Sequence, residues 1–273
     1  MNMSTDPESL SIQKPDYGID APGVRRGMVI AGIGGLTLAA IAASATGFGL
    51  IETGSAFAVI FTTLGLVVAV YGMYMGGYMT YGSRVGKLRT RDRLLDQVNE
   101  LRPWQGGEAV LDVGCGRGLM MIGAAKRLIA RRKGLSVGVD LWRIEDQSAN
   151  TPAAAMENAR IEGVADRVRI DTGDARALSY AEGSFDVVLS HWVIHNLEKP
   201  EDRLKALDEM LRVLRPGGVL VLADIACIAE YEVHLVARKV THLRFLDGGL
   251  EARVMGALSG GSYRPQALLA CRA

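Results

Sequence analysis

The chain has 273 residues, of which 49% are hydrophobic and 22% charged, and its formal net charge at pH 7 is +1. A charge balance this close to neutral gives no reason to expect a nucleic-acid partner. The three cysteines are far apart and show neither a disulfide framework nor the ligand spacing of a zinc site, so no metal is expected.

The first 24 residues combine prolines with acidic side chains and contain few apolar ones. A segment of this composition cannot bury enough apolar surface to order itself. We therefore predict a disordered cytoplasmic tail over residues 1–24.

Two long stretches without charged side chains follow, at residues 28–51 and 55–83, separated by Glu52. About 20 apolar residues suffice to cross the hydrocarbon core of a bilayer, and both stretches are longer. We predict that residues 25–83 form two transmembrane helices, at about 28–51 and 55–80. The alternative is a buried helical hairpin in a soluble protein, although core helices usually have one polar face.

Basic side chains lie on the outer flanks of both apolar stretches. Arg25 and Arg26 precede the first stretch, a basic run from Arg84 to Arg93 follows the second, and the connecting turn carries only Glu52. The positive-inside rule then places both termini in the cytoplasm. We expect a multi-pass protein of the cell (inner) membrane, with the basic run close to lipid headgroups.

The second apolar stretch contains Gly72 and Gly76 in the spacing GxxxG. Small residues at this spacing let two membrane helices approach closely. The motif would therefore allow a homodimer.

Residues 84–273 alternate short hydrophobic runs with segments of helical periodicity. This alternation predicts an α/β fold with a doubly wound, mostly parallel sheet that helices cover on both faces. The predicted strands lie near residues 108–113, 135–139, 167–171, 185–190 and 218–224, with further strands at 266–271 and near 241–246. The predicted helices lie near residues 87–101, 117–132, 151–163, 200–214 and 228–240.

The segment Ala109–Gly118, with the sequence AVLDVGCGRG, reads as a buried strand that enters a glycine-rich turn and opens a helix. Glycines in such a turn let the backbone approach a ligand where a Cβ atom would collide. Leu119 stands where a dinucleotide-binding fingerprint has its third glycine. The spacing therefore argues against a nicotinamide-dependent oxidoreductase.

Acidic residues end the next two strands. Asp140 closes an apolar strand and can accept hydrogen bonds from both hydroxyls of a ribose, and Leu141 beside it could lie against a purine ring. Asp174 follows the third strand, where it can accept from an exocyclic amine of adenine. These two acids predict a nucleoside site.

Leu214–Gly218, with the sequence LRPGG, ends a helix and turns into the strand Val219–Ala223. With the glycine turn and the two acids, this order of motifs resembles the class I S-adenosylmethionine-dependent methyltransferases, of the type close to ubiquinone/menaquinone methyltransferases (methyltransferase type 11 domain), from about Leu101 to Asp224. The resemblance implies a seven-stranded Rossmann-like sheet over residues 84–273. It also implies that S-adenosylmethionine is the cofactor and lies across the carboxyl ends of the strands.

The same resemblance implies a role for each position. Asp112 and the glycine turn would hold the methionine part of the cofactor, Asp140 the ribose and Asp174 the adenine. Ala175 would donate its backbone N–H to the adenine ring. The positions expected to contact the cofactor are Asp112, Gly114, Gly116, Gly118, Asp140, Leu141, Asp174, Ala175 and Ser190.

Two histidines, His191 and His195, follow the fourth strand, where a substrate would approach. Imidazole gains and loses a proton near neutral pH and is the commonest general base. We hypothesise that one of the two positions or deprotonates the methyl acceptor. The alternative is that both only pack at the end of the sheet.

An enzyme held at a membrane suits a substrate that dissolves in the bilayer. We therefore expect a methyltransferase that moves a methyl group from S-adenosylmethionine to a small lipophilic acceptor, such as a quinone, an isoprenoid or a phospholipid. The alternative is a membrane scaffold or sensor that binds S-adenosylmethionine without catalysis. No Asn-Pro-Pro-Tyr segment follows the fourth strand, which disfavours methylation of bases or glutamine.

Overall fold

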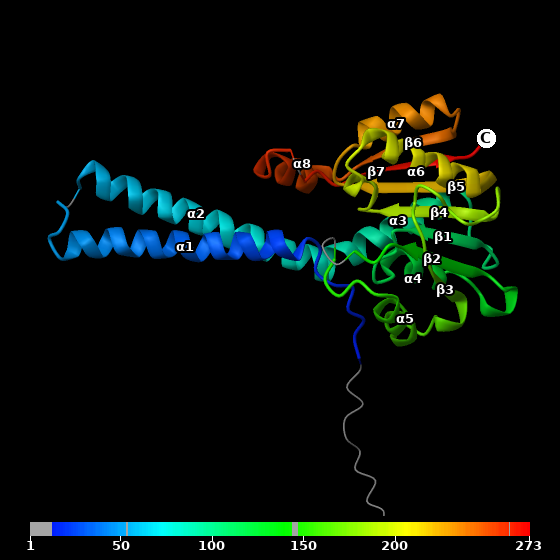
Figure 1. Ribbon diagram of the computed structural model, residues 1–273, viewed down its shortest axis with the longest axis horizontal. Helices are drawn as coiled ribbons and strands as arrows, with labels where there is room; N and C mark the ends of the chain where they lie inside the picture. The colour runs from blue at the N-terminus through cyan, green and yellow to red at the C-terminus, as the bar shows by residue number, and fades with distance from the viewer. Residues whose placement is uncertain (1–12, 53, 144–146, 262) are drawn as a thin grey trace, which may run out of the picture. The chain divides into compact units, whose positions relative to one another are not determined.

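The computed structural model describes residues 13–52, 54–143, 147–261 and 263–273 (Figure 1). It divides into two compact units. One, which we call the sheet unit, contains residues 13–17, Thr90–Trp142 and the described residues of Thr151–Ala273. The other, which we call the helical unit, contains Gly18–Arg89 and Arg143–Asn150.

The described residues of the sheet unit form a seven-stranded sheet with the order β3-β2-β1-β4-β5-β7-β6. The pairs from β3 to β5 are parallel, and β7 runs antiparallel to both of its neighbours. This is the mostly parallel Rossmann-like sheet that the sequence predicts. The strands are β1 (Ala109–Val113), β2 (Leu135–Asp140), β3 (Val168–Thr172), β4 (Phe185–His191), β5 (Leu214–Asp224), β6 (Thr241–Asp247) and β7 (Gln266–Cys271).

Hydrophobic cores lie on both faces of this sheet, and helices cover each of them. Met210 of α6 and Tyr231 of α7 are fully buried in one core, and Leu95 of α3 and Met120 of α4 are buried in the other. Strands buried on both faces consist of nearly continuous apolar runs, as the sequence shows here. The helices are α3 (Lys87–Leu101), α4 (Leu119–Ala125), α5 (Pro152–Ile161), α6 (Pro200–Val213), α7 (Ile228–Ala237) and α8 (Gly249–Leu258).

Two helices of the sheet unit differ from the prediction. The helix predicted over residues 117–132 ends at Ala125, because the chain turns away so that the N–H of Ile129 can donate to the carbonyl of Gly106, 2.8 Å away. Helix α8 was not predicted. Ala252 and Met255 are buried at helical spacing, but Gly249 begins the helix, Gly256 lies within it and two glycines follow it, and glycine is a poor helix former.

The helical unit is a hairpin of α1 (Pro22–Gly47) and α2 (Ala56–Tyr81), followed by a π-helical turn, Gly82–Gly86. Pro22 occupies the first turn of α1, where a missing N–H costs nothing, so this helix starts earlier than the predicted span. Both helices are long and apolar enough to cross a membrane by length and composition.

Small residues form the contact between α1 and α2. A Cβ atom added to Gly35 would lie 2.6 Å from the backbone nitrogen of Ala69, and one added to Gly72 would lie 2.5 Å from the carbonyl oxygen of Met28. Gly72 and Gly76, the GxxxG pair, therefore face α1 of the same hairpin. The close approach that the motif predicts occurs within one chain.

The predicted tail divides at its middle. Residues 1–12 lie outside the described residues. Tyr17, however, is only 5% exposed and its hydroxyl donates to Glu162, 3.0 Å away, in the sheet unit. Residues 13–17 differ from the predicted disorder because Tyr17 is buried and bonds to a residue far away in the sequence, which the local composition does not reveal.

Candidate functional site

The carboxyl ends of the parallel strands share one edge of the sheet. Val113 at the end of β1 lies opposite Val139 of β2 on one side and Ser190 of β4 on the other. His191, the last residue of β4, lies opposite Ala223 of β5. The polar residues that follow these strands are thus brought to the same edge, which is where open α/β sheets bind their ligands.

The turn between β1 and α4 needs its glycines for conformational reasons. Gly114, Gly116 and Gly118 have φ angles of 73°, 51° and 86°, in the left-handed region that other residues avoid. A Cβ atom on Gly114 would also lie 2.3 Å from the side chain of Val193. The turn is therefore compact, and no side chain at these three positions covers its backbone.

Asp112 lies inside the sheet unit. It is 1% exposed, and its Oδ2 accepts a hydrogen bond of 2.8 Å from the backbone N–H of Met121 in α4. Burial raises the pKa of this carboxyl group to about 7, although the bond from Met121 opposes the shift, and the nearby charge of Asp140 adds to it. Asp112 thus joins β1 to the first turn of the helix that follows the glycine turn.

Asp140, at the end of β2, caps the glycine turn. Its Oδ2 accepts from the N–H of Gly116 at 2.8 Å, and its Oδ1 accepts from the N–H of Trp142 at 2.6 Å. Both carboxylate oxygens of Asp140 thus accept from backbone N–H groups, one within the glycine turn and one just beyond β2. Leu141 beside it is 44% exposed, as a residue that contacts a ligand ring would be.

Asp174, beyond the end of β3, is held by an arginine. The Arg176 guanidinium donates to both of its oxygens, the shortest distance being 2.6 Å, and donates to Asp202 of α6 at 2.9 Å. These hydrogen bonds raise the pKa of Arg176. Ala175, between the two, is partly buried against the core on that face. An adenine amine would therefore share the Asp174 carboxylate with Arg176.

Ser190 supplies a buried polar atom at the centre of this edge. The residue is 3% exposed, and its Oγ has no hydrogen-bond partner within the parts of the chain that the structure describes. A buried hydroxyl without a partner is costly, so a polar ligand group would relieve it. With the glycine turn and the two acids, this atom fits the polar groups of S-adenosylmethionine.

His191 belongs to an aromatic cluster. Its ring stacks on Trp192 with 4.8 Å between the ring centroids, and Trp192 meets Tyr263 edge to face at 5.7 Å. Trp192 has a φ of 60°, a strained backbone for an aromatic residue. Such outliers gather at functional sites, and here the strain turns the chain at the end of β4.

His195 lies in the 3-10 turn Ile194–Asn196 and forms a pair with Asp224, the last residue of β5. The ring Nδ1 contacts Asp224 Oδ1, and the backbone N–H of His195 donates to Asp224 Oδ2 at 3.1 Å. Tyr231 of α7 donates its hydroxyl to Asp224 from 3.2 Å. Asp224 is 2% exposed, whereas the His195 side chain is 20% exposed. A buried carboxylate thus orients an imidazole that solvent can reach.

Sequence reasoning missed Asp224 and Arg176. Asp224 carried a usable signal, because it follows the apolar run of β5 as Asp140 follows that of β2. Arg176 carried none, since only the fold shows that its guanidinium joins Asp174 to Asp202.

Known proteins resemble the central part of this chain. The family model described as "Methyltransferase domain" matches residues 111–222. Methyltransferase GfsG of Streptomyces halstedii is 39% identical over 134 residues, which are 49% of this chain and 44% of that protein. The 2-methyl-6-phytyl-1,4-hydroquinone methyltransferase of a Synechocystis species is 32% identical over 139 residues, which are 48% and 38% of the two chains. The chain thus spans less than half the length of these relatives.

A solved structure resembles the fold. The geranyl diphosphate C-methyltransferase of Streptomyces coelicolor A3(2), solved with Mg2+, geranyl diphosphate and S-adenosyl-L-homocysteine, superposes with a TM-score of 0.51. The match covers 68% of this chain and 79% of that one at 17% sequence identity. At this identity the likeness concerns the architecture of the sheet unit.

Proposed function

We propose a function for the whole chain from the premise that residues 111–222 form a methyltransferase domain, whose cofactor is S-adenosylmethionine: the protein transfers a methyl group to a small lipophilic acceptor at a membrane. The observation that carries this proposal is Asp140, which ends β2 and caps the glycine turn through Gly116. Acid and turn would then bind one nucleoside-containing ligand together.

Each residue of the shared edge would have one task in cofactor binding. Asp140 would accept the ribose hydroxyls, with Leu141 against the base. Asp174 would accept the adenine amine while Arg176 keeps its carboxylate oriented, and the N–H of Ala175 would face the ring. The glycine turn and Ser190 would contact the amino-acid end of the cofactor. Asp112 would fix the position of the turn through its hydrogen bond from Met121.

When bound, S-adenosylmethionine supplies an electrophilic methyl group, so the protein has to orient a nucleophile and remove its proton. We assign the proton removal to His195. Its Nδ1–H would donate to Asp224, which leaves the lone pair of Nε2 to accept the acceptor's proton. Asp224 would stabilise the imidazolium that results, and His191 would contribute to the acceptor side through its stack with Trp192.

Membrane anchoring is supported by the hairpin of the helical unit. Both helices are apolar enough to span a bilayer, and they expose large apolar side chains such as Ile33, Ile41 and Val70. Basic residues flank the hairpin at its two outer ends, so the positive-inside rule favours cytoplasmic termini. A lipophilic acceptor, as the hydroquinone named for the Synechocystis relative would be, would reach such an enzyme from the bilayer.

The test is calorimetric titration of the full chain in mild detergent with S-adenosylmethionine. We expect binding by the wild type and at least tenfold weaker binding by Asp140→Ala, because both the ligand contact and the cap of the turn are lost. Asp166→Ala is the matched control, since Asp166 is a solvent-exposed acid that pairs with its chain neighbour Arg167. A folded wild-type chain that does not bind would refute the proposal.

Binding alone does not distinguish an enzyme from a scaffold or sensor. Labelled S-adenosylmethionine should therefore be incubated with the full chain and a membrane lipid extract. Transfer of label to a lipid-soluble product supports the enzyme. Binding without transfer to any extract supports the non-catalytic alternative.

A further inference from the structure

Residues Asp16 and Tyr17 lie in the sheet unit, ahead of the two apolar helices in the chain. Together we call them the strap. Asp16 contacts α5 twice through its backbone: its N–H donates to Oδ1 of Asn158 at 2.9 Å, and its carbonyl accepts from Nδ2 of Asn158 at 2.8 Å. This two-way pairing holds the strap across 142 residues of sequence.

The strap also holds the glycine turn. Nδ2 of Asn158 donates to the carbonyl of Arg117 at 3.0 Å, and the Arg117 guanidinium pairs with the Asp16 carboxylate at 3.1 Å. Arg117 stands between Gly116 and Gly118 in the turn. Asn158 is 2% exposed, so its amide connects the strap and the turn inside the protein, where hydrogen bonds are costly to lose.

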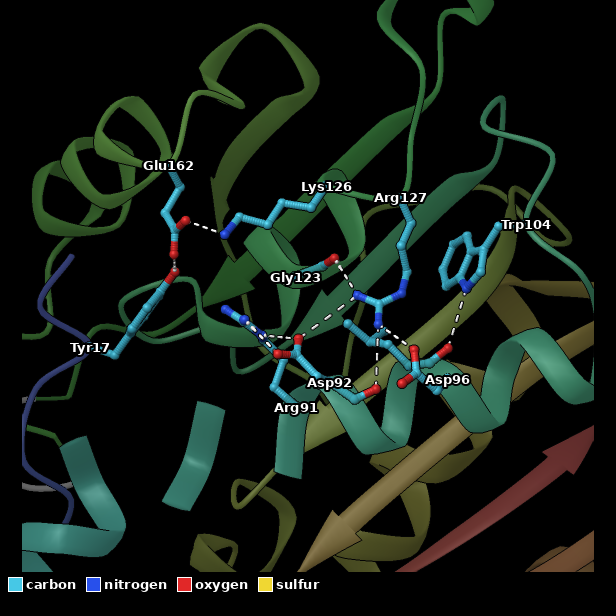
Figure 2. Close-up of polar contacts among 10 residues, drawn as sticks. Tyr17, Arg91, Asp92, Asp96, Trp104, Gly123, Lys126, Arg127 and Glu162 are labelled. Atoms are coloured by element: carbon cyan, nitrogen blue, oxygen red, sulfur yellow. Dashed lines mark hydrogen bonds and ion pairs between the residues drawn. The ribbon is translucent and has the colours of Figure 1, made fainter. Parts of the chain in front are cut away.

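Tyr17 forms the second contact of the strap with the sheet unit. Figure 2 shows its hydroxyl bound to Glu162, which lies just beyond α5 and also pairs with Lys126 beyond α4. Burial, with the charge of Glu162 and its hydrogen bond, raises the pKa of Tyr17, so the hydroxyl stays a donor. The strap therefore forms hydrogen bonds with two residues of the segment that follows β2, Asn158 and Glu162.

We propose that Asp16 and Asn158 are positioning residues for the cofactor, which hold Arg117 and so keep the glycine turn in the shape that receives S-adenosylmethionine. This inference rests on the proposed function, because it names residues that act on the same cofactor site. Gly116 connects the strap contacts to the cofactor site, because it precedes Arg117 and donates its N–H to Asp140.

A short stretch of chain joins the strap to the first apolar helix. Helix α1 begins at Pro22, shortly after Tyr17. The segment that leads into the first apolar helix is thus the segment that orders the cofactor turn. A sheet unit without its strap would keep its strands and helices but bind the cofactor less tightly.

The experiment uses the full chain in mild detergent and compares wild type, Asn158→Ala, Asp16→Ala and Asp16→Glu. It measures the Kd for S-adenosylmethionine, the melting temperature, and amide hydrogen exchange of residues 114–118. We expect Asn158→Ala to raise the Kd roughly tenfold, the scale of a lost buried hydrogen-bond group, and to speed exchange in the turn. Asp16→Ala should raise the Kd by a smaller factor, and Asp16→Glu should restore it.

The matched control is Glu157→Ala on the same helix. Glu157 forms an exposed pair with Arg160 at 3.3 Å, so its loss should leave the Kd and the exchange of the turn unchanged. A merely structural role would lower the melting temperature without a rescue by Asp16→Glu or a localised change in exchange. If Asn158→Ala does not fold, Asp16→Ala decides, because that carboxylate is 73% exposed.

Wild-type Kd and wild-type exchange at residues 114–118 in both alanine variants would overturn the proposal. A wild-type chain that does not bind S-adenosylmethionine would instead refute the proposed function. Exchange at the turn would still report on the strap in that case. The two failures are therefore distinguishable.

Discussion

At the scale of single residues, the edge of the sheet combines carboxylates in different environments. Asp112 is enclosed by the protein, and burial raises its pKa to about 7. Asp224 is equally buried but receives donors from His195, Tyr231 and Ile225. One acid thus binds a proton readily, while the other has the hydrogen bonds that a carboxylate needs in order to orient an imidazole.

Asp112 should make stability depend on pH. Because its pKa is raised in the folded chain, the folded state holds a proton that the unfolded state releases between about pH 4 and pH 7, so the free energy of unfolding falls as the pH rises through this window. The loss is at most roughly 4 kcal/mol. Asp112→Asn keeps an acceptor for Met121 and has no charge to bury. Its melting temperature should therefore fall less than that of the wild type between about pH 5 and pH 8, whereas parallel profiles would contradict the assignment.

His195 and Asp224 should affect turnover and not cofactor binding. Loss of a general base typically slows turnover by a factor of about 100 to 10,000, so we expect His195→Ala to lower kcat in this range with an unchanged Kd for S-adenosylmethionine. His234 offers a matched control, since it forms another histidine–aspartate pair, with Asp208 at 2.8 Å. An equal loss in His234→Ala would show that the effect is structural.

At the scale of elements, the central strands β1, β2 and β4 were predicted because a strand buried on both faces must be apolar throughout. The acids at strand ends could be identified as candidates for the same reason, since they interrupt such runs. Contacts between elements could not be predicted: the pairing of His195 with Asp224 and of Asp16 with Asn158 depends on which strands and helices become neighbours. Helix α8 was missed because the glycines at its start, within it and after it weaken the helical signal of its sequence.

The hairpin offers a test of its glycine contact. Gly35→Ile would place a branched side chain 2.6 Å from backbone atoms of Ala69 and Gly65, which cannot move away as a side chain can. We expect the variant to lose helix packing, with a lower melting temperature of the hairpin in detergent. Gly34→Ile is the control, because a Cβ atom there meets nothing within 4 Å. Equal stability of the two variants would contradict the observed contact.

At the scale of the whole molecule, the chain joins an apolar helical unit to a sheet unit that contains residues 111–222, the part that matches the methyltransferase domain model. Apolar burial is not screened by salt, whereas attraction of a basic run to lipid headgroups is screened. The full chain should therefore float with liposomes after a wash at high salt. Release by the wash would show that the basic residues around Arg84–Arg93, and not the hairpin, make the association.

The strap also has a consequence for biosynthesis. Asp16 leaves the ribosome before both apolar helices, but its partner Asn158 follows 142 residues later. At a synthesis rate of about 5–20 residues per second, the interval is roughly 7 to 30 s. The hairpin is therefore complete before the strap can close, and the closing contact joins a segment that precedes the hairpin to one that follows it.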